Sequence, residues 1–216
     1  MARPSITLKL ATTLDGRIAT AGGVSRWITC EDSRRIVHEL RSMHDAVLVG
    51  IETALKDDPE LTVRLPDYEG GQPRRIVLDS RARLPLSSKL VQTARVIPTW
   101  VVTTTDLPRE MLAAQVRQIK VPSKHQRVDL DAALEALATA GIESLFIEGG
   151  GVIATAFLRA GYVDRLEWFR APTILGGDAR PVIGHLNIEN LSQMYRFTRL
   201  AVQAVGDDLW ESYELS

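Results

Sequence analysis

The sequence is almost without cysteine: Cys30 is the one cysteine among its 216 residues. A single thiol excludes a disulfide within the chain and a zinc site of the Cys₂His₂ or Cys₄ kind. No apolar run reaches the roughly 18 residues that a membrane-spanning helix needs. Residues 1–5 also lack the long apolar stretch of a signal peptide. We therefore predict a cytoplasmic protein that makes no use of a membrane and holds no metal.

An excess of charge of either sign is missing too. The chain has 26 Lys and Arg against 27 Asp and Glu, for a net charge of −1. This balance gives no general attraction to nucleic acid or to a membrane surface, so any anion site must be local. The hydrophobic content of 45% and the charged content of 25% are ordinary for a globular protein. The length fits one α/β domain, and we predict a single domain over residues 1–216.

Strand patterns and helix patterns alternate along the first two thirds of the chain. Residues 5–11 alternate, with Ile6, Leu8 and Leu10 on a core face and Lys9 on the other. Further strands are predicted at 46–50, 76–78, 99–103, 118–121, 144–147, 165–170, 195–205 and 208–213. Because the last three follow one another directly, we predict a mainly parallel central sheet, flanked by helices, with antiparallel strands at its C-terminal edge.

Helices are predicted between these strands. The first is capped by Thr29, runs to about Arg41 and buries Ile36, Val37, Leu40 and Met43. A short helix or turn is expected at 52–56, and helices at 107–116, 130–141 and 149–161, the last with Val152, Ile153, Ala156 and Phe157 facing inward. Residues 66–73 are polar and glycine-rich and predict a loop.

Three successive glycines, Gly149 to Gly151, stand between a predicted strand and a predicted helix. Glycine lets the backbone approach a ligand closely, and the N–H groups at a helix start attract phosphate. The letters from Gly149 to Ala154 also fit G-x-G-x-x-A. A dinucleotide-binding βαβ unit would add an acidic residue after a second strand, but Asp178 follows two glycines instead. We favour a pyrophosphate-binding turn on another fold; a tight turn without ligand is the alternative.

A second group of polar residues lies in the first third of the chain. Arg41, Arg64 and Ser25 could together hold a phosphate, with the arginines acting bidentately, or the arginines could be ordinary surface charges. Asp57 could donate a proton or accept a hydroxyl, or it could simply belong to a turn. Trp27 could stack on a ligand ring or belong to the core.

Ordered blocks of sequence extend over nearly the whole chain, at residues 10–19, 25–29, 38–41, 49–53, 57–64, 75–80, 148–151 and 171–177. In this order they resemble the reductase domain of the bifunctional riboflavin-biosynthesis deaminase–reductase. The resemblance implies a dihydrofolate-reductase-like α/β fold, usually dimeric, with NADPH as the hydride donor. It implies reduction of the ribosyl group of a 5-amino-6-ribosylaminopyrimidine 5′-phosphate to ribityl.

The same resemblance suggests site residues by position. The cofactor would contact Ala11, Trp27, Thr53, Asp57, Ser80, Gly149, Gly150, Gly151, Val152, Ile153, Ala154, Thr155 and Ala156. The substrate would contact Ser25, Arg41, Leu61, Arg64 and Glu148. Lys9, Asp57 and Glu148 are the candidates for catalysis. Ser80, with Arg81 or Arg83, could hold the 2′-phosphate of the cofactor.

One departure from the family matters. The zinc deaminase signatures H-x-E and P-C-x-x-C are both absent, so deamination must occur elsewhere or the substrate must be another member of the pathway. Two other functions stay open: reduction of a pteridine or another carbonyl compound on the same fold, and nucleotide binding without turnover. The set Lys9, Asp57 and Glu148 argues against the second. For the expected homodimer, Trp168, Phe169 and Ile174 are candidate contacts.

Overall fold

The computed structural model describes residues 3–215; Met1, Ala2 and Ser216 lie outside them. The chain divides into two compact units. The first consists of residues 38–146 together with the N-terminal end as far as Ser5, and the second of residues 6–37 and 147–216. Two elements, α1 (Glu31–Ser42) and β9 (Ser144–Glu148), run from one unit into the other. The single domain over residues 1–216 stays a prediction.

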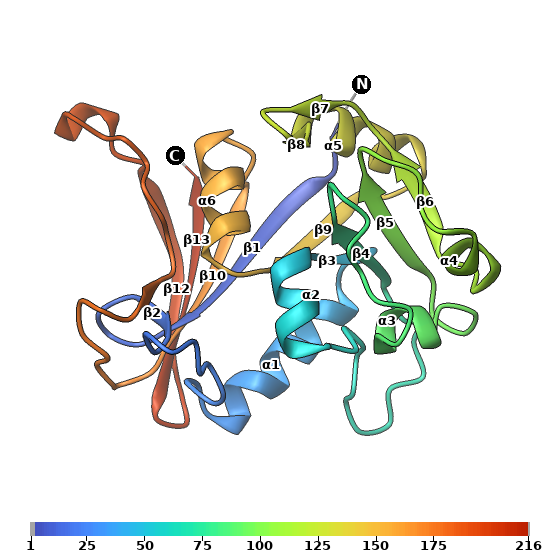
Figure 1. Cartoon of the computed structure of the whole chain (residues 1–216). Coiled ribbons are helices and arrows are strands. Elements are labelled where there is room, and N and C mark those ends of the chain that lie inside the picture. The colour runs from blue at the N-terminus through green and yellow to red at the C-terminus, as the bar shows by residue number, and fades with distance from the viewer. Residues whose placement is uncertain (1–2, 216) are drawn as a thin grey trace. The chain divides into compact units, whose positions relative to one another are not determined.

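The first unit is built on parallel strands in the order β9-β3-β4-β5-β6. The pairs β3–β4, β4–β5 and β5–β6 are all parallel (Figure 1). Their bounds are β3 Ala46–Gly50, β4 Arg74–Leu78, β5 Thr99–Thr103 and β6 Arg117–Lys120. Every residue of β3 and β5 is buried, as expected of inner strands covered on both faces. These strands are therefore predictable from their continuous apolar runs.

The other elements of the first unit are short. They are α2 (Ile51–Asp57), α3 (Lys89–Gln92), α4 (Arg109–Ala113), α5 (Leu130–Thr139) and the hairpin of β7 (Ser123–Lys124) and β8 (Arg127–Val128). The predicted helix over 107–116 is too long, because Pro108 precedes α4 and Gln115, at φ 66°, follows it. Helix α3 and the hairpin were not predicted. The loop at 66–73 is confirmed.

The second unit carries strands in the order β12-β13-β10-β1. Their bounds are β1 Ser5–Thr12, β10 Arg165–Arg170, β12 Phe197–Val205 and β13 Asp208–Leu215. The pair β1–β10 is parallel, whereas β10–β13 and β12–β13 are antiparallel. A separate antiparallel ribbon joins β2 (Arg17–Ala19) to β11 (Arg180–Pro181), and a short 3₁₀ helix, η1, covers Leu191–Gln193. The predicted fold class, mainly parallel with antiparallel C-terminal strands, is confirmed.

The start of α1 differs from the prediction. The helix begins at Glu31, so Cys30, not Thr29, precedes it. The cap comes from far along the chain, because Asp208 Oδ2 accepts from Cys30 N at 2.7 Å and from Ser33 Oγ at 2.6 Å. At the other end the prediction that Met43 is buried is wrong: the helix has ended, and Met43 is 71% exposed.

Helix α6 (Gly151–Arg159) buries Phe157 as predicted, but the rest of its buried face differs from the predicted one. Ala154, Phe157 and Leu158 are buried, which is the i, i+3, i+4 pattern of one helix face. Val152 lies off this stripe and is 54% exposed, so the inward orientation predicted for it is wrong.

Candidate active site

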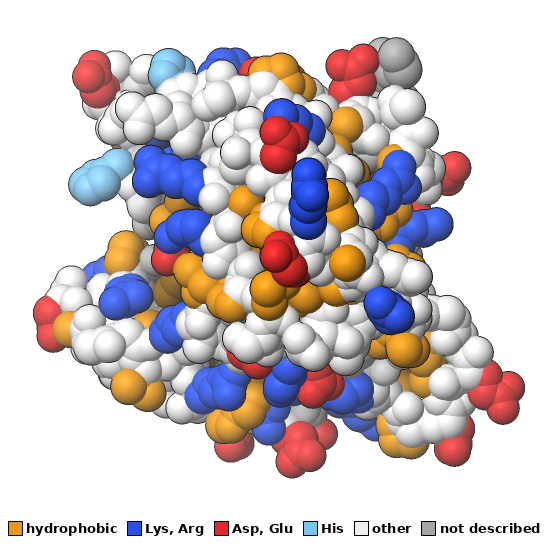
Figure 2. Space-filling view, turned by 45° about the vertical axis from the view of Figure 1, so that its right-hand side comes forward, with side chains coloured by type: hydrophobic (Ala, Val, Ile, Leu, Met, Phe, Trp, Pro, Cys, Tyr) orange, Lys and Arg blue, Asp and Glu red, His pale blue; other side chains and the backbone are white. Residues whose placement is uncertain are grey.

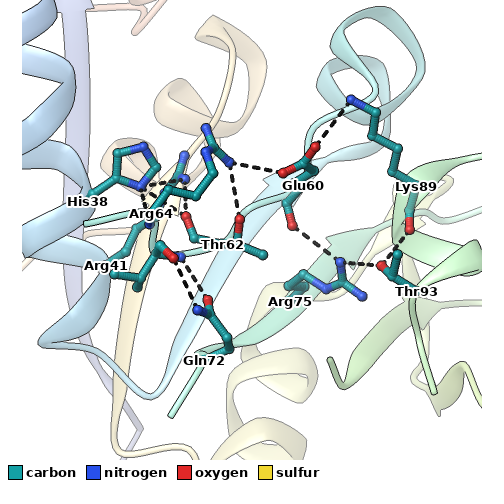
Figure 3. Close-up of polar contacts among 10 residues, drawn as sticks. His38, Arg41, Glu60, Thr62, Arg64, Gln72, Arg75, Lys89 and Thr93 are labelled. Carbon is teal, nitrogen blue, oxygen red and sulfur yellow. Dashed lines mark hydrogen bonds and ion pairs between the residues drawn. The ribbon is translucent and has the colours of Figure 1, made fainter. Parts of the chain in front are cut away.

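The segment from Glu60 to Arg64, here called the arginine segment, belongs to a stretch without helix or strand. Side chains rather than a neighbouring strand satisfy its backbone (Figure 3). Gln72 Oε1 accepts from Val63 N at 2.8 Å, and Gln72 Nε2 donates to Val63 O at 3.1 Å. Arg41 Nη1 donates to Thr62 O at 2.7 Å. The segment therefore has a defined course although it pairs with no strand.

Leu61 shows how firmly this segment is held. Its φ of 55° lies in the left-handed region, which L-residues other than Asn and Asp rarely occupy. Its side chain is nevertheless buried, with 3% exposed. Such a backbone persists only where the surroundings determine it, and such sites are common where a ligand binds.

The two arginines predicted to hold phosphate meet at Thr62. Arg64 Nη1 lies 3.1 Å from Thr62 Oγ1 and 3.3 Å from Glu60 Oε2, while Arg41 reaches the Thr62 carbonyl. Arg41 is buried, so the surface-charge alternative fails for it. Arg64 is exposed, with 54% of its side chain accessible. The structure thus brings a buried and an exposed guanidinium onto one residue, an arrangement suited to a bidentate oxyanion.

His38 also belongs to this cluster, although it was not predicted. Its Nδ1 lies 3.0 Å from Thr62 O, 3.2 Å from Arg64 N and 3.5 Å from Arg41 Nη1. His38 and Arg41 stand three residues apart on α1, which places them on the same face of the helix. That spacing was the one signal in the sequence that could have pointed to it. Gln72 carried no comparable signal.

Arg75, on β4, supports the segment from within the core. Its guanidinium donates to Glu60 O at 3.3 Å, Thr93 Oγ1 at 2.8 Å, Leu90 O at 3.3 Å, Ile97 O at 2.7 Å and Thr99 Oγ1 at 2.7 Å. Burial lowers the pKa of Arg75 to about 10, while the negative charge of Glu60 acts in the opposite direction. It therefore stays a cation at neutral pH.

The predicted cofactor contacts of the first unit lie on α2 and after β4. Thr53 and Asp57 stand four residues apart on α2, and so on one face of that helix. Ser80 Oγ accepts from Val128 N at 3.0 Å, which fixes the hairpin of β7 and β8 to the end of β4. Arg83 pairs with Glu52 at 2.5 Å, so a 2′-phosphate would have to compete with that carboxylate.

The glycine turn, Gly149 to Gly151, precedes α6 in the second unit. Gly150 is the N-cap, without a side-chain cap bond, and the first turn has no acidic residue. Within residues 3–215, the N–H groups of Gly151 and Val152 have no acceptor. A Cβ on Gly151 would lie 2.8 Å from Pro181 O and 3.0 Å from Val182 O. Residue 151 must therefore be glycine because the backbone of Pro181 and Val182 leaves no space for a Cβ. The N–H groups at the helix start are suited to binding an anion.

Two of the predicted cofactor contacts after the glycine turn, Ala154 and Thr155, help to hold the fold. Thr155 Oγ1 donates to Gly151 O at 2.5 Å and accepts from Gly184 N at 2.7 Å, and Ala154 is fully buried. Asp178 lies in the turn before β11 rather than after a strand, and β10, the strand after α6, pairs with β1. The βαβ dinucleotide alternative therefore lacks its acidic residue.

Lys9 and its neighbours occupy one face of the second unit's sheet. Lys9 stands opposite Glu167 in the register, and its Nζ is 5.8 Å from the centre of the Phe169 ring. Glu167 is fully buried and accepts from Trp210 Nε1 at 2.6 Å and from the Ser212 hydroxyl. Phe169 is also fully buried, so its suggested role as a dimer contact is wrong. Ala11 follows Lys9 by two positions on the same face.

Trp27 is not a core residue. Its side chain is 70% exposed, and the Arg34 guanidinium lies 4.4 Å from the ring centre. The core alternative for Trp27 is wrong, and the ring has the exposure that stacking on a ligand requires. Ser25, two residues earlier, is half-buried, as is Glu148 at the end of β9.

Charged side chains of both signs lie on the face that Figure 2 shows. On the face in Figure 2, basic and acidic side chains alternate with small apolar areas. Among residues 3–215, no group of three or more His, Cys, Asp and Glu is placed to hold a metal ion. None of the helices described there is long and apolar enough to cross a membrane.

Comparison with known proteins identifies the family. Residues 4–210 match the model of the RibD C-terminal domain. The chain belongs to this family. Its sequence is 36% identical to the riboflavin biosynthesis protein RibD of Actinobacillus pleuropneumoniae over 217 residues, covering 98% of this chain and 57% of that protein. The chain thus spans little more than half of the bacterial RibD proteins that it matches.

A relative of similar length is also known. The 2,5-diamino-6-ribosylamino-4(3H)-pyrimidinone 5′-phosphate reductase of Methanothermobacter thermautotrophicus is 39% identical over 214 residues, covering 98% of each chain. Acinetobacter baumannii RibD superposes with a TM-score of 0.89 at 31% identity, over 99% of this chain and 58% of that one. The dihydrofolate-reductase-like fold implied by the sequence blocks is thereby confirmed.

Proposed function

We propose that this chain catalyses the NADPH-dependent reduction of the ribosyl group of a 5-amino-6-ribosylaminopyrimidine 5′-phosphate to ribityl, a step of riboflavin biosynthesis. The observation that carries the proposal is the similarity, over 98% of both chains, to an archaeal reductase named for such a substrate. That relative also lacks room for a second domain of the bacterial kind, which fits the absence of deaminase signatures here. The name of the relative favours a pyrimidine that keeps its 2-amino group.

The chemistry of the side chains supports a phosphorylated substrate. Arg41 and Arg64 meet at Thr62 in the first unit and would bind the 5′-phosphate, with Leu61 next to Thr62 in the chain. Ser25, in the second unit, is also assigned to the substrate. The N–H groups of the glycine turn would bind the cofactor's pyrophosphate, and the exposed ring of Trp27 would stack on a ring of the cofactor. The guanidinium groups and the backbone N–H groups are both suited to binding phosphate oxygens.

When bound, NADPH supplies the hydride that reduces C1′ of the ribose. As the sugar ring opens, a proton goes to the released ring oxygen or to the amine nitrogen. Lys9, Asp57 and Glu148 orient the ribose and supply this proton in our proposal. The arginines hold the phosphate end, which fixes C1′ for the transfer.

Oxidation of NADPH in the presence of the ribosylaminopyrimidine phosphate tests the proposal. The assay uses the substrate with and without the 2-amino group, and NADH in place of NADPH. We expect turnover of the 2-amino compound with NADPH. Turnover of a pteridine or another carbonyl compound instead would favour the second reductase function, and binding of NADPH without any turnover would favour a nucleotide-binding module.

Arg64→Ala gives the sharpest variant for this assay. Loss of a charge-assisted bond costs about 1.5–3 kcal/mol, so we expect the substrate KM to rise roughly 10- to 100-fold. The affinity for NADPH should change little, because Arg64 is assigned to the substrate alone. Equal loss of both would contradict the assignment.

We also propose that the enzyme is a cytoplasmic homodimer. Strand β12 lies at the edge of the second unit's strand order and exposes Leu200 (48%) and Val202 (50%). An exposed apolar edge strand is a ready surface for a second copy. Light scattering after size exclusion should give twice the chain mass, and Val202→Lys should shift it to the mass of one chain.

A further inference from the structure

We propose that His38 and Gln72 are positioning residues that hold the arginine segment so that Arg64 meets the phosphate of a sugar phosphate. The inference rests on the proposed function, which assigns a phosphorylated substrate to the arginines. Neither residue is among the predicted contacts. Both act on the two peptide groups that lead into Arg64 rather than on the ligand itself.

Gln72 takes the place of a neighbouring strand. Its amide oxygen and nitrogen bond the N–H and the carbonyl of Val63, at 2.8 Å and 3.1 Å, as a paired strand residue would. These two hydrogen bonds fix the orientation of the peptide groups before and after Val63. The peptide group after Val63 leads into Arg64. The loop that carries Gln72 is closed by Tyr68, whose hydroxyl donates to Gly71 O at 2.8 Å.

His38, on α1, holds the opposite ends of the same two peptide groups. Its Nδ1 lies 3.2 Å from Arg64 N and 3.0 Å from Thr62 O. With the ring proton on Nε2, Nδ1 accepts from the Arg64 N–H; with the proton on Nδ1, it donates to the Thr62 carbonyl. In either tautomer the ring ties α1 to the arginine segment. The same Nδ1 lies 3.5 Å from Arg41 Nη1, so His38 lies beside the Arg41 guanidinium as well as the Arg64 backbone (Figure 3).

The left-handed Leu61 explains why such support is needed. A strained residue directly before Thr62 would relax if its neighbours were released, and the direction of the Arg64 side chain would change with it. Arg64 is exposed, so little packing of its own holds it. Its side chain bonds Glu60 and Thr62 within the same segment, so its position follows the backbone that His38 and Gln72 hold.

Binding of ribose 5-phosphate, measured by calorimetry, tests the proposal without relying on turnover. Ribose serves as the ligand without phosphate. We expect His38→Ala and Gln72→Ala each to weaken ribose 5-phosphate binding about fivefold to tenfold, the effect of one or two lost hydrogen bonds. The affinity for NADPH should stay unchanged. In an Arg64→Ala background, neither substitution should weaken binding further.

Matched controls remove a similar side chain elsewhere in the same unit. His44, near the end of α1, bonds Leu40 O at 2.7 Å, and Gln92 Nε2 donates to Leu86 O at 2.6 Å. His44→Ala and Gln92→Ala should leave ribose 5-phosphate affinity at the wild-type value. If they weaken it as much as the test variants do, the effect is general destabilisation and the proposal is wrong.

A pair of conservative variants decides the matter should the alanine variants fold poorly. Asn places its amide where Nδ1 of histidine lies, and Gln places it near Nε2. His38→Asn should bind ribose 5-phosphate within about twofold of the wild type, while His38→Gln should lose as much as His38→Ala. Equal affinities of the two would overturn the role of Nδ1. Wild-type protein that does not bind ribose 5-phosphate would overturn the positioning proposal, whereas absent turnover with intact binding would overturn only the proposed reaction.

Discussion

The arginine segment and the glycine turn reach a defined backbone by opposite means. In the arginine segment, Gln72, His38 and Arg41 bond backbone groups that no strand covers. In the glycine turn, Gly151 has no side chain, and the backbone at Pro181 and Val182 fills the space instead. The first should be disturbed by removing atoms and the second by adding them. Substitutions of both kinds can test this contrast.

The largest effect is expected at Arg75, which supports the arginine segment through Glu60 O. Arg75→Met would leave several buried oxygens without a donor, among them Ile97 O and Thr99 Oγ1. We expect a loss of about 3–5 kcal/mol in the free energy of unfolding, measured by denaturant titration. Arg74→Met is the control: the neighbouring Arg74 is only half-buried and lies beside the Trp100 ring, so its loss should stay under about 1 kcal/mol.

Gly151→Ala tests the glycine turn by adding one carbon. The new Cβ would lie 2.8 Å from Pro181 O, a backbone atom that cannot rotate away. We expect about 1–3 kcal/mol of destabilisation, together with weaker NADPH binding. Gly177→Ala, in the same unit, meets nothing within 4 Å and should be nearly neutral. Stability equal to that of the Gly177 variant would remove the steric argument.

Asp15 shows that the second unit also uses a side chain to hold backbone. The Thr13 hydroxyl, and then the N–H groups of Gly176 and Leu175, lower the pKa of Asp15 from 3.8 to about 2. Because the folded value is the lower one, the ionised carboxylate stabilises the fold above pH 4, and this contribution is lost as the pH falls towards 2. Asp15→Asn should therefore be less stable than the wild type at neutral pH and should lose less stability on acidification. Thermal unfolding of both proteins, measured between pH 2 and pH 7, tests this prediction. A stability difference between them that does not change with pH would contradict it.

The smallest effect is expected at Glu60. Its carboxylate pairs with Arg64 at 3.3 Å and with Lys89 at 3.5 Å, and both pairs are exposed. Such pairs contribute about 0.2–1 kcal/mol, so Glu60→Gln should release Arg64 and tighten ribose 5-phosphate binding about twofold. Weaker binding would mean that Glu60 orients Arg64 instead of competing for it.

Sequence reasoning served the fold better than the site. The strands at Ala46–Gly50 and Thr99–Thr103 were predictable because inner parallel strands are apolar throughout. Helix α3 has four residues, too few for a periodic pattern, and the cap of α1 comes from Asp208, which no local signal reveals. The exposure of Val152 could not be predicted because α6 is apolar at residues 152–154 and 156–158, so its sequence does not single out one buried stripe.

For the site, the sequence provided residue types but not their contacts. Arg41 and Arg64 could be nominated, and the structure brings them together at Thr62. Gln72 could not be nominated, because its role lies in two bonds to the backbone of Val63 and its own neighbourhood is an ordinary polar loop. Side-chain bonds to irregular backbone depend on tertiary structure, so they leave no periodic trace in the sequence.

The division of the second unit along the chain has a consequence for synthesis on the ribosome. Strand β1 is made well before its parallel partner β10, Arg165–Arg170, which follows more than a hundred residues later in the chain. The first unit is complete once Phe146 has emerged, so it can acquire its structure while β1 still waits for β10. In a nascent chain halted near that point, β1 would lack the hydrogen bonds that β10 later provides. We expect molecular chaperones to bind such a chain.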